Sequence, residues 1–303
     1  MKLFLNISPA KMGNSFVQQF FLQQQELLRG RRIFFLKNQF KDAQPHYRMK
    51  KPIVEASLTG HIGKADLAEL ASDYFSFVDS DKYDSVYHLV TGGLFGDPMR
   101  CDIDKARAAL ITLKALTKDH DVHLFTFIRR QDKFLESYYV QKVQGGQQLS
   151  FDEFMETVDM RQISWNKLIT IAEELFGPDR IEVHPFEMIR FGEKEFLMNC
   201  ARFFTDPEAF DYNNLDQLPK NRSYSDIALK IAQSANPLLS QEEQRLLRTF
   251  LQSNFSNVTH PRAQLFSKEL SQEIMNYHQG GNEAVFSRYC RDQDFGALGY
   301  LPE

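Results

Sequence analysis

Short apolar runs alternate with helical spacings of apolar side chains along the first 190 residues of the chain. Residues 2–8 form a strand-length apolar run, and apolar side chains then recur every three or four positions from Phe16 to Leu27, which indicates a strand followed by a helix. Four more strands are predicted, at residues 32–37, 83–90, 122–128 and 180–183. Helices are predicted at residues 65–77, 102–118 and 131–144, whereas residues 38–60 are polar and irregular and predict no element.

Alternation of strands and helices predicts a doubly wound α/β fold, in which helices cover both faces of a parallel sheet. Beyond residue 190 the pattern is helical, with helices predicted at residues 194–205, 224–235, 240–254, 265–278 and 281–291. The chain carries no internal repeat and no low-complexity linker. We therefore expect one domain over residues 1–303, in which residues 1–190 form a nucleotide-binding α/β core and residues 191–303 a helical cap.

The composition excludes several classes of protein. A formal net charge of −4 argues against a nucleic-acid binder, which shows a basic excess. The three cysteines, Cys101, Cys200 and Cys290, are far apart and match no metal-binding spacing, which is typical of reduced thiols in a cytoplasmic protein. No apolar run approaches the roughly 20 residues that span a bilayer, and residues 2–8 are too short for a signal peptide, so we expect no membrane span.

A turn of the sequence Pro-Ala-Lys-Met-Gly-Asn-Ser separates the first strand from the first helix. Such a turn places backbone N–H groups beside the positive end of the helix dipole, where phosphate or sulfate binds. Gly13 permits close approach of the backbone, Asn14 and Ser15 are able to cap the helix or donate to an anion, and Lys11 adds a positive charge. The turn lacks the GxxxxGK[ST] pattern of ATPases and GTPases, and taken alone it is also typical of an ordinary helix cap.

A second polar motif follows the predicted strand at residues 122–128. Arg129 stands at the end of that strand, and Ser137 lies eight residues later on the next helix. An arginine fork and a hydroxyl at this spacing are able to hold a second phosphate. Each half of the motif is common alone, as a surface arginine and an ordinary helical serine.

The two motifs together resemble those of the PAPS-dependent sulfotransferases, where PAPS is 3′-phosphoadenosine 5′-phosphosulfate. Lys11, Gly13 and Ser15 match the 5′-phosphosulfate loop, and Met12 and Asn14 depart from it. The segment from Arg129 to Ser137 resembles the 3′-phosphate motif. Three later segments resemble bacterial members in the same order, namely residues 180–187, 221–223 and 282–289, so the resemblance covers about residues 3 to 291. It implies a sheet like that of P-loop NTPases.

The resemblance also implies an activity: transfer of a sulfuryl group from PAPS to an acceptor hydroxyl or amine, with PAP as product and without a metal. Lys11 would then stabilise the bridging oxygen of the donor. The 5′-phosphate would be held by residues of the turn and the 3′-phosphate by Arg129 and Ser137, and Arg222 would add a further nucleotide contact. These nucleotide-binding residues are Lys11, Met12, Gly13, Asn14, Ser15, Arg129, Ser137 and Arg222.

The general base is not fixed by the resemblance. Many carbohydrate sulfotransferases carry a glutamate after the third strand, where this chain has Thr91-Gly92-Gly93. His61, in the polar region that shapes the acceptor site of the family, is the first choice, with His88 and Asp97 as alternatives. Each of the three is also typical of a purely structural side chain.

Two other functions stay open. The missing glutamate favours a non-catalytic protein that binds PAP or PAPS, although Lys11 is needed less for binding than for transfer. A P-loop kinase is disfavoured because the Walker lysine and serine or threonine pair is absent. The acceptor is expected to be a carbohydrate or glycolipid, from the bacterial resemblance alone. The sequence does not indicate an oligomeric state.

Overall fold

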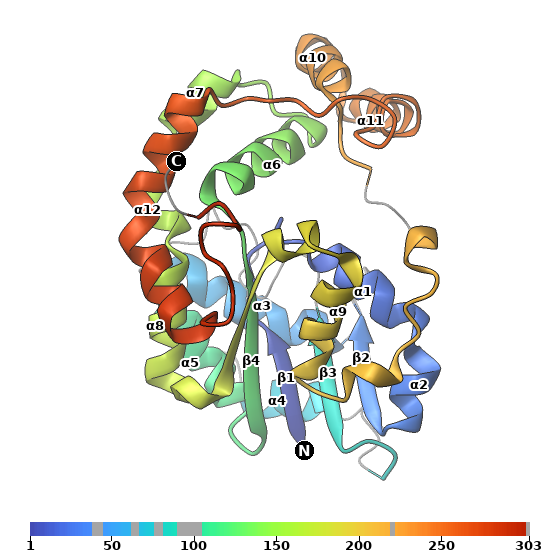
Figure 1. Cartoon of the computed structure of the whole chain (residues 1–303), viewed down its shortest axis with the longest axis vertical. Coiled ribbons are helices and arrows are strands. Elements are labelled where there is room, and N and C mark those ends of the chain that lie inside the picture. The colour runs from blue at the N-terminus through green and yellow to red at the C-terminus, as the bar shows by residue number, and fades with distance from the viewer. Residues whose placement is uncertain (38–44, 62–66, 76–80, 90–104, 219–221, 301–303) are drawn as a thin grey trace. The chain divides into compact units, whose positions relative to one another are not determined.

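The computed structural model describes the chain except for residues 38–44, 62–66, 76–80, 90–104, 219–221 and 301–303 (Figure 1). The described residues form two compact units, and each is treated by itself below. Unit 1 comprises residues 1–129, 161–218 and 279–300, and unit 2 comprises residues 130–160 and 219–278. The expected single-domain organisation stays a prediction.

Unit 1 is built on a five-stranded parallel sheet with the strand order β2-β3-β1-β4-β5. Its strands are β1 (Lys2–Asn6), β2 (Ile33–Lys37), β3 (Ser85–Leu89), β4 (Asp121–Ile128) and β5 (Ile181–Pro185). All five predicted strands are present, and the α/β class is confirmed. Short apolar runs made these strands visible because both faces of a parallel sheet are buried.

One face of the sheet is aromatic. Phe4, Tyr87 and Phe125 alternate onto this face, and the ring of Tyr87 stacks 5.2 Å from that of Phe125. Phe21 of α1 (Asn14–Gln23) and Phe204, just after α9 (Glu193–Arg202), cover these rings, with centroids 5.3 Å and 4.0 Å from Tyr87. This cluster explains much of the heavy use of phenylalanine in the chain.

The opposite face is mainly aliphatic, with Leu3, Leu5 and Leu124 fully buried. Four helices pack against one another in unit 1, namely α3 (Pro45–Thr59), α4 (Leu67–Phe75), α5 (Ala106–Leu116) and α8 (Trp165–Phe176). Figure 1 shows α9 in front of the sheet and α3 and α4 behind it, so that helices cover both faces. The short helix α2 (Gln25–Gly30) leads into β2. Single 3₁₀ turns occur at Met160–Ile163, Pro178–Arg180, Phe186–Arg190, Pro207–Ala209, Leu215–Gln217 and Asn236–Leu238.

Helix α3 lies in the segment for which the sequence predicted no element. Pro45 opens it, where a missing N–H costs nothing, and Pro52 lies inside it. From residue 51 onward, where the side chains of α3 are described, Pro52, Ile53, Ala56 and Ser57 are buried. A polar surface and an internal proline therefore hid a helix that tertiary packing supports.

Helix α12 (Lys268–Tyr289) corrects a second expectation, because the two helices predicted at residues 265–278 and 281–291 are one. The glycine pair at 280–281 does not end it. A Cβ on Gly281 would lie 3.6 Å from Asn166 Cβ, so the helix packs closely at that point. Glycine in a helix costs only about 1 kcal/mol, which buried side chains such as Val285 and Phe286 on the following turn offset.

Unit 2 contains α6 (Gln131–Gln144), α7 (Phe151–Glu156), α10 (Asp226–Ala235), α11 (Gln241–Asn254) and the first half of α12. Serines start three of these helices. Ser150 and Ser240 each form a capping box with the glutamate three residues later, and Ser225 caps α10. The serine caps fix the starts of these helices, and α10 and α11 begin within two residues of the predicted positions.

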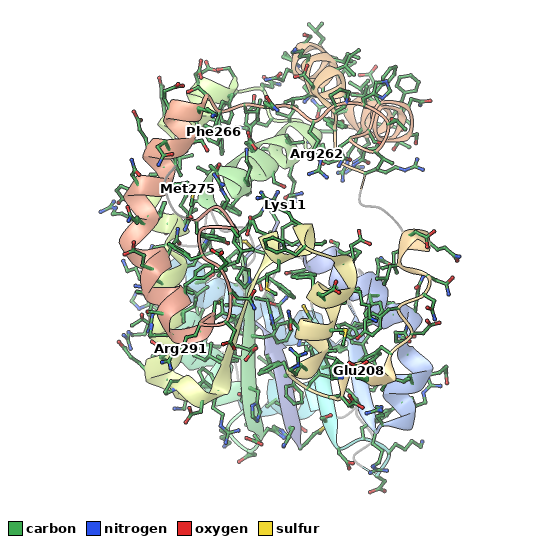
Figure 2. All side chains as sticks on the ribbon, in the orientation of Figure 1. Lys11, Glu208, Arg262, Phe266, Met275 and Arg291 are labelled. Atoms are coloured by element: carbon green, nitrogen blue, oxygen red, sulfur yellow. The ribbon has the colours of Figure 1, made fainter. Side chains whose placement is uncertain are left out.

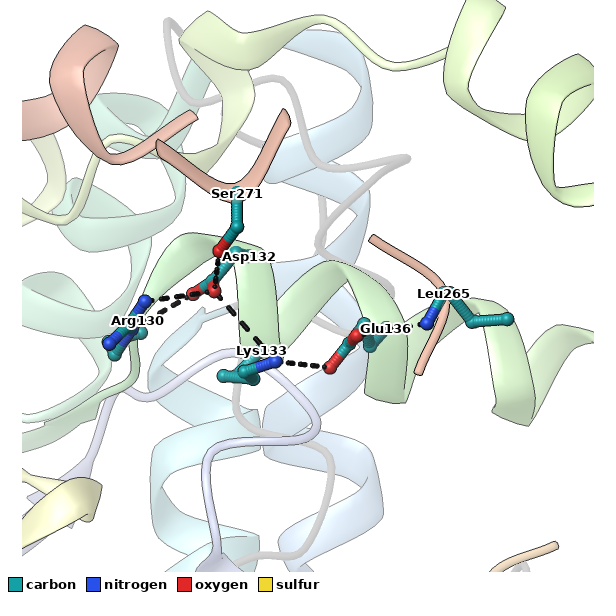
Figure 3. A network of polar contacts seen from close by, with 6 residues as sticks. All are labelled: Arg130, Asp132, Lys133, Glu136, Leu265 and Ser271. Carbon is teal, nitrogen blue, oxygen red and sulfur yellow. Dashed lines mark hydrogen bonds and ion pairs between the residues drawn. The ribbon is translucent and has the colours of Figure 1, made fainter. Parts of the chain in front are cut away.

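A buried carboxylate ties α6 to α12 within unit 2 (Figure 3). Asp132 is fully buried and accepts two hydrogen bonds of 3.1 Å from the Arg130 guanidinium and one from the Ser271 hydroxyl. Burial alone would raise the pKa of Asp132, but these bonds and the charges of Arg130 and Lys133 hold the pKa below its ordinary value. One turn along α6, Glu136 accepts from Lys133 Nζ at 2.9 Å and from the Leu265 N–H at 3.2 Å.

We expect Asp132→Asn to lower the free energy of unfolding by about 2 kcal/mol at neutral pH, because the Arg130 charge loses its partner. The folded state lowers the pKa of Asp132, so this contribution is complete above the unfolded value of about 3.9 and is lost as the pH falls through the lower folded value. The difference in denaturant unfolding between wild type and variant should therefore begin to shrink below about pH 4 and vanish below the folded pKa of Asp132. Asp226→Asn, which breaks an exposed pair with Lys230, is the control and should cost at most about 0.5 kcal/mol. A pH-independent difference would contradict the prediction.

Candidate functional site

The strand order places a topological switch point at the carboxyl ends of β1 and β4. From β1 the chain crosses to β2 on one side of the sheet, whereas from β4 it continues to β5 on the other side. The loops that leave these two neighbouring strands therefore diverge, and in α/β sheets ligands bind at such a point. The turn after β1 and Arg129 after β4 both start here, as the sequence predicted.

A set of buried hydrogen bonds fixes the chain where it enters the turn. Asn6 Oδ1 accepts from the Ser8 N–H at 2.8 Å and from the Ser8 hydroxyl at 2.5 Å. The Ser8 Oγ in turn accepts from the Phe127 N–H at 2.7 Å. The three residues are almost completely buried, so the end of β1 is attached to the end of β4 just before the turn begins.

The turn itself has an unusual backbone. Lys11 and Gly13 have φ angles of 69° and 90°, in the left-handed region, and Met12 between them is fully buried. Left-handed residues that alternate with ordinary ones orient successive N–H groups toward one concave side, which forms an anion-binding nest. Lysine rarely adopts this conformation, and strain of this kind concentrates at functional sites. Figure 2 shows Lys11 beyond the carboxyl ends of the strands.

Gly13 is required by its surroundings as well as by its backbone angle. A Cβ at this position would lie 2.2 Å from Cδ2 of Phe186, which is far closer than any stable contact. Phe186 belongs to the 3₁₀ turn after β5 and forms one wall of the turn. Only a residue without a side chain lets the backbone run this close to the ring.

Arg129 is held from three directions. Its Nη1 donates to the Lys11 carbonyl at 3.1 Å, and its guanidinium carbon lies 5.3 Å from the centre of the Phe186 ring. Its own carbonyl accepts from Trp165 Nε1 at 2.7 Å. The sequence did not assign roles to Phe186 or Trp165. The signals that mark them are the resemblance of residues 180–187 to the family and the presence of one tryptophan in the chain.

The start of α1 carries a buried amide without a partner. Asn14 is 4% exposed, and among the described residues neither its Nδ2 nor its Oδ1 has a hydrogen-bond partner. A buried polar group left unpaired costs about 1–3 kcal/mol, and an absent ligand or water is a common reason for one. The first turn of α1 contains no acidic residue and no side-chain cap, so the positive end of its dipole is not neutralised there.

The structure brings together six of the predicted residues in unit 1, namely Lys11, Met12, Gly13, Asn14, Ser15 and Arg129. The other two nucleotide-binding candidates belong to unit 2. Ser137 is half-buried on α6, and Arg222 is exposed ahead of α10, with its carbonyl accepting from Gln252 at 3.0 Å. Their proposed contacts with the nucleotide stay predictions.

The candidate bases lie in different settings. His61 is exposed just after α3, next to Gly60, which packs against the side chain of Lys105. Lys105 precedes α5, which connects the parallel strands β3 and β4. Such a helix begins near the carboxyl edge of the sheet, which is also the edge that carries the turn at Lys11. His88 is 1% exposed within β3, in register with Leu5. Asp97 and the Thr91-Gly92-Gly93 segment lie outside the described residues.

Two other kinds of site are absent from the described residues. No three histidines, cysteines or acidic residues in this part of the chain gather into a metal-binding group. No described helix is both long enough and apolar enough to cross a membrane.

Comparison with known proteins supports the fold. No family model and no curated protein matches the sequence. Among solved structures, a sulfotransferase from Alicyclobacillus acidocaldarius matches with a TM-score of 0.51 over 98% of this chain and 97% of that chain, at 11% sequence identity. At this identity the likeness concerns the fold. The chain thus has a parallel α/β sheet flanked by helices that is similar to the fold of a sulfotransferase.

Proposed function

We propose that this protein is a sulfotransferase that takes a sulfuryl group from PAPS and transfers it to a hydroxyl or amine of an acceptor. The observation that carries the proposal is the meeting of the turn at Lys11 with Arg129 at the carboxyl ends of β1 and β4. The fold likeness to a sulfotransferase supports the same conclusion.

The residues of the turn fit a 5′-phosphate group. The left-handed backbone at Lys11 and Gly13 directs N–H groups to one side, and the unpaired Asn14 amide supplies a further donor. We propose that Arg129 and Ser137 hold the 3′-phosphate, the first through its guanidinium fork and the second through its hydroxyl. Arg222 would add a second positive charge to the nucleotide site.

Charge stabilisation is the main catalytic role that we assign to the chain. PAPS supplies an electrophilic sulfuryl group that leaves behind a phosphate. Lys11 would neutralise the negative charge that develops on the bridging oxygen, and the N–H groups of the turn would stabilise the phosphate. Such groups act without moving, because the fold already holds them in place.

His61 is our proposed general base, which would accept the proton of the acceptor group. Its neighbour Gly60 packs against the side chain of Lys105, near the carboxyl edge of the sheet, which supports this assignment. For the acceptor we propose a carbohydrate or glycolipid, on the resemblance to bacterial members. The free, buried thiols of Cys200 and Cys290 support our proposal of a cytoplasmic location.

We expect Arg129→Ala to weaken PAP binding at least about thirtyfold, because a charge-assisted contact to phosphate is removed. Arg129→Lys should recover only part of the loss, since an ammonium has no planar fork. Ser137→Ala should cost less, about fivefold, as expected for one hydrogen bond. Titration calorimetry with PAP measures all three dissociation constants. Arg107→Ala, which removes an exposed guanidinium on α5 that pairs with Glu174, is the matched control and should leave the affinity unchanged.

The same titrations separate the alternatives. A wild type that ignores PAP but binds ATP in the presence of magnesium would be a kinase or another NTPase, and the proposal would be wrong. A wild type that binds PAP tightly but converts no PAPS with any sugar or glycolipid acceptor would be a nucleotide-binding protein without transferase activity.

A further inference from the structure

The last described residues of the chain return to the interior of unit 1. After α12 the chain makes a short irregular segment that ends at Tyr300, which is fully buried. The Tyr300 ring lies 4.9 Å from that of Phe286 and 5.9 Å from that of Phe295, and its N–H donates to the Phe295 carbonyl at 3.1 Å. Leu298 is also fully buried. The segment is therefore a packed part of the core.

The Tyr300 hydroxyl donates a hydrogen bond of 2.8 Å to Glu187 Oε2. Glu187 is 3% exposed, so this bond lies in the interior of the unit. Burial, together with the Glu187 carboxylate, raises the pKa of Tyr300 well above its ordinary value, and the positive charge of Arg129 acts in the opposite direction. Tyr300 thus lies within the electrostatic range of both Glu187 and Arg129.

Glu187 directly follows Phe186, the residue that contacts both parts of the candidate site. The Phe186 ring lies against the backbone at Gly13 and under the guanidinium of Arg129. A displacement of the turn that starts at Phe186 would therefore change the wall of the anion loop and the position of Arg129 together. The Tyr300 hydroxyl is a direct restraint on that turn.

We propose that Tyr300 is a positioning residue for the anion site and that its hydroxyl, by engaging the Glu187 carboxylate, holds the turn at Phe186, and with it the Arg129 guanidinium, in the position that binds a phosphate group. This inference rests on the proposed function for the identity of the ligand. A buried carboxylate that loses a hydrogen-bond donor attracts the nearest cation more strongly, because little solvent screens it. Without the Tyr300 hydroxyl, the Glu187 carboxylate would be drawn toward neighbouring charges, and the turn at Phe186 would move with it.

The test is a double-mutant cycle on the full chain, with PAP as the probe. Tyr300→Phe should raise the dissociation constant of PAP about tenfold, as expected when one charged hydrogen bond is lost. Glu187→Gln removes the buried charge that makes the loss of this bond costly, so Tyr300→Phe should have less than a twofold effect in that background. A purely structural tyrosine would weaken binding by a similar factor in both backgrounds, and this result would overturn the proposal.

The emission of Trp165 gives a second readout that needs no ligand. The chain has one tryptophan, and its indole N–H is bonded to the Arg129 carbonyl. Tyr300→Phe should shift this emission, whereas the matched control Tyr289→Phe should not. Tyr289 donates an equivalent bond of 2.6 Å to Glu173 on α8, the helix that begins at Trp165, so the control also detects general loosening of α8.

The outcomes distinguish the two proposals. If wild type binds no PAP, the proposed function fails, and the emission of Tyr300→Phe alone decides whether Tyr300 positions Arg129. If wild type binds PAP and Tyr300→Phe matches it in both affinity and emission, only the positioning role is wrong. Equal effects of Tyr300→Phe and Tyr289→Phe would also reject it.

Discussion

Lys11→Ala is expected to reduce the conversion of PAPS to PAP about a thousandfold while it leaves the affinity for PAP within about threefold of the wild type. The lysine would act on charge that develops only as the sulfuryl group departs, and PAP lacks that group. The backbone carbonyl of residue 11, which accepts from Arg129, is retained in the variant, so the loop should keep its shape. Chromatography of the nucleotides measures conversion, and calorimetry measures PAP binding.

Two further variants make this experiment decisive. Lys11→Arg keeps a positive charge at the same place and should retain more activity than Lys11→Ala. Lys230→Ala removes an exposed lysine from α10 and should change neither quantity. If Lys11→Ala converts PAPS at the rate of the wild type, transfer does not occur at this loop. If it loses PAP binding in parallel, the lysine contributes to binding and not to the chemical step.

Gly13→Ala should weaken PAP binding more than about a hundredfold and lower the free energy of unfolding by about 2 kcal/mol or more. The new Cβ would need to displace the Phe186 ring, which lies 2.2 Å away, and alanine disfavours the φ angle of 90°. Because Phe186 also contacts Arg129, its displacement disturbs both halves of the site. Calorimetric titration and denaturant unfolding measure the two effects.

Gly177→Ala provides a control for backbone strain away from the site. Gly177 has a φ of 91° and a ψ of 149°, a conformation almost restricted to glycine, but a Cβ there would meet no atom within 4 Å. This variant should lose about 1–3 kcal/mol of stability to backbone strain and should bind PAP normally. If Gly13→Ala weakens PAP binding no more than Gly177→Ala, the turn has more space than the structure indicates and Phe186 is not a fixed wall.

The sequence predicted the sheet well because local patterns encode buried strands. Runs such as the one at residues 122–128 are apolar enough to be recognised without any tertiary information. The sequence does not predict helix α3 because polar residues and Pro52 mask the buried positions 53, 56 and 57, and it predicts two helices in place of α12 because two adjacent glycines lower the local helix propensity. In both cases packing against other elements outweighed local propensity.

The same limit applies to the candidate site. The turn at Lys11 and the strand end at Arg129 were recognisable because each carries polar residues at a strand terminus. Their neighbours were not, since Phe186 and Trp165 reach the site from β5 and α8, and no local pattern states which distant segments will meet. The base was not resolved because a histidine on a loop acquires its role from an acceptor that the sequence does not describe.

The left-handed backbone at residue 11 sets the stability of the fold against the proposed activity at a single position. Glycine would suit that φ angle better than lysine, by about 1 kcal/mol, so the fold is less robust than it could be at this point. The lysine side chain stands where the backbone disfavours it. Under the proposed function, selection for a more stable protein and selection for sulfuryl transfer would therefore act in opposite directions on the same residue.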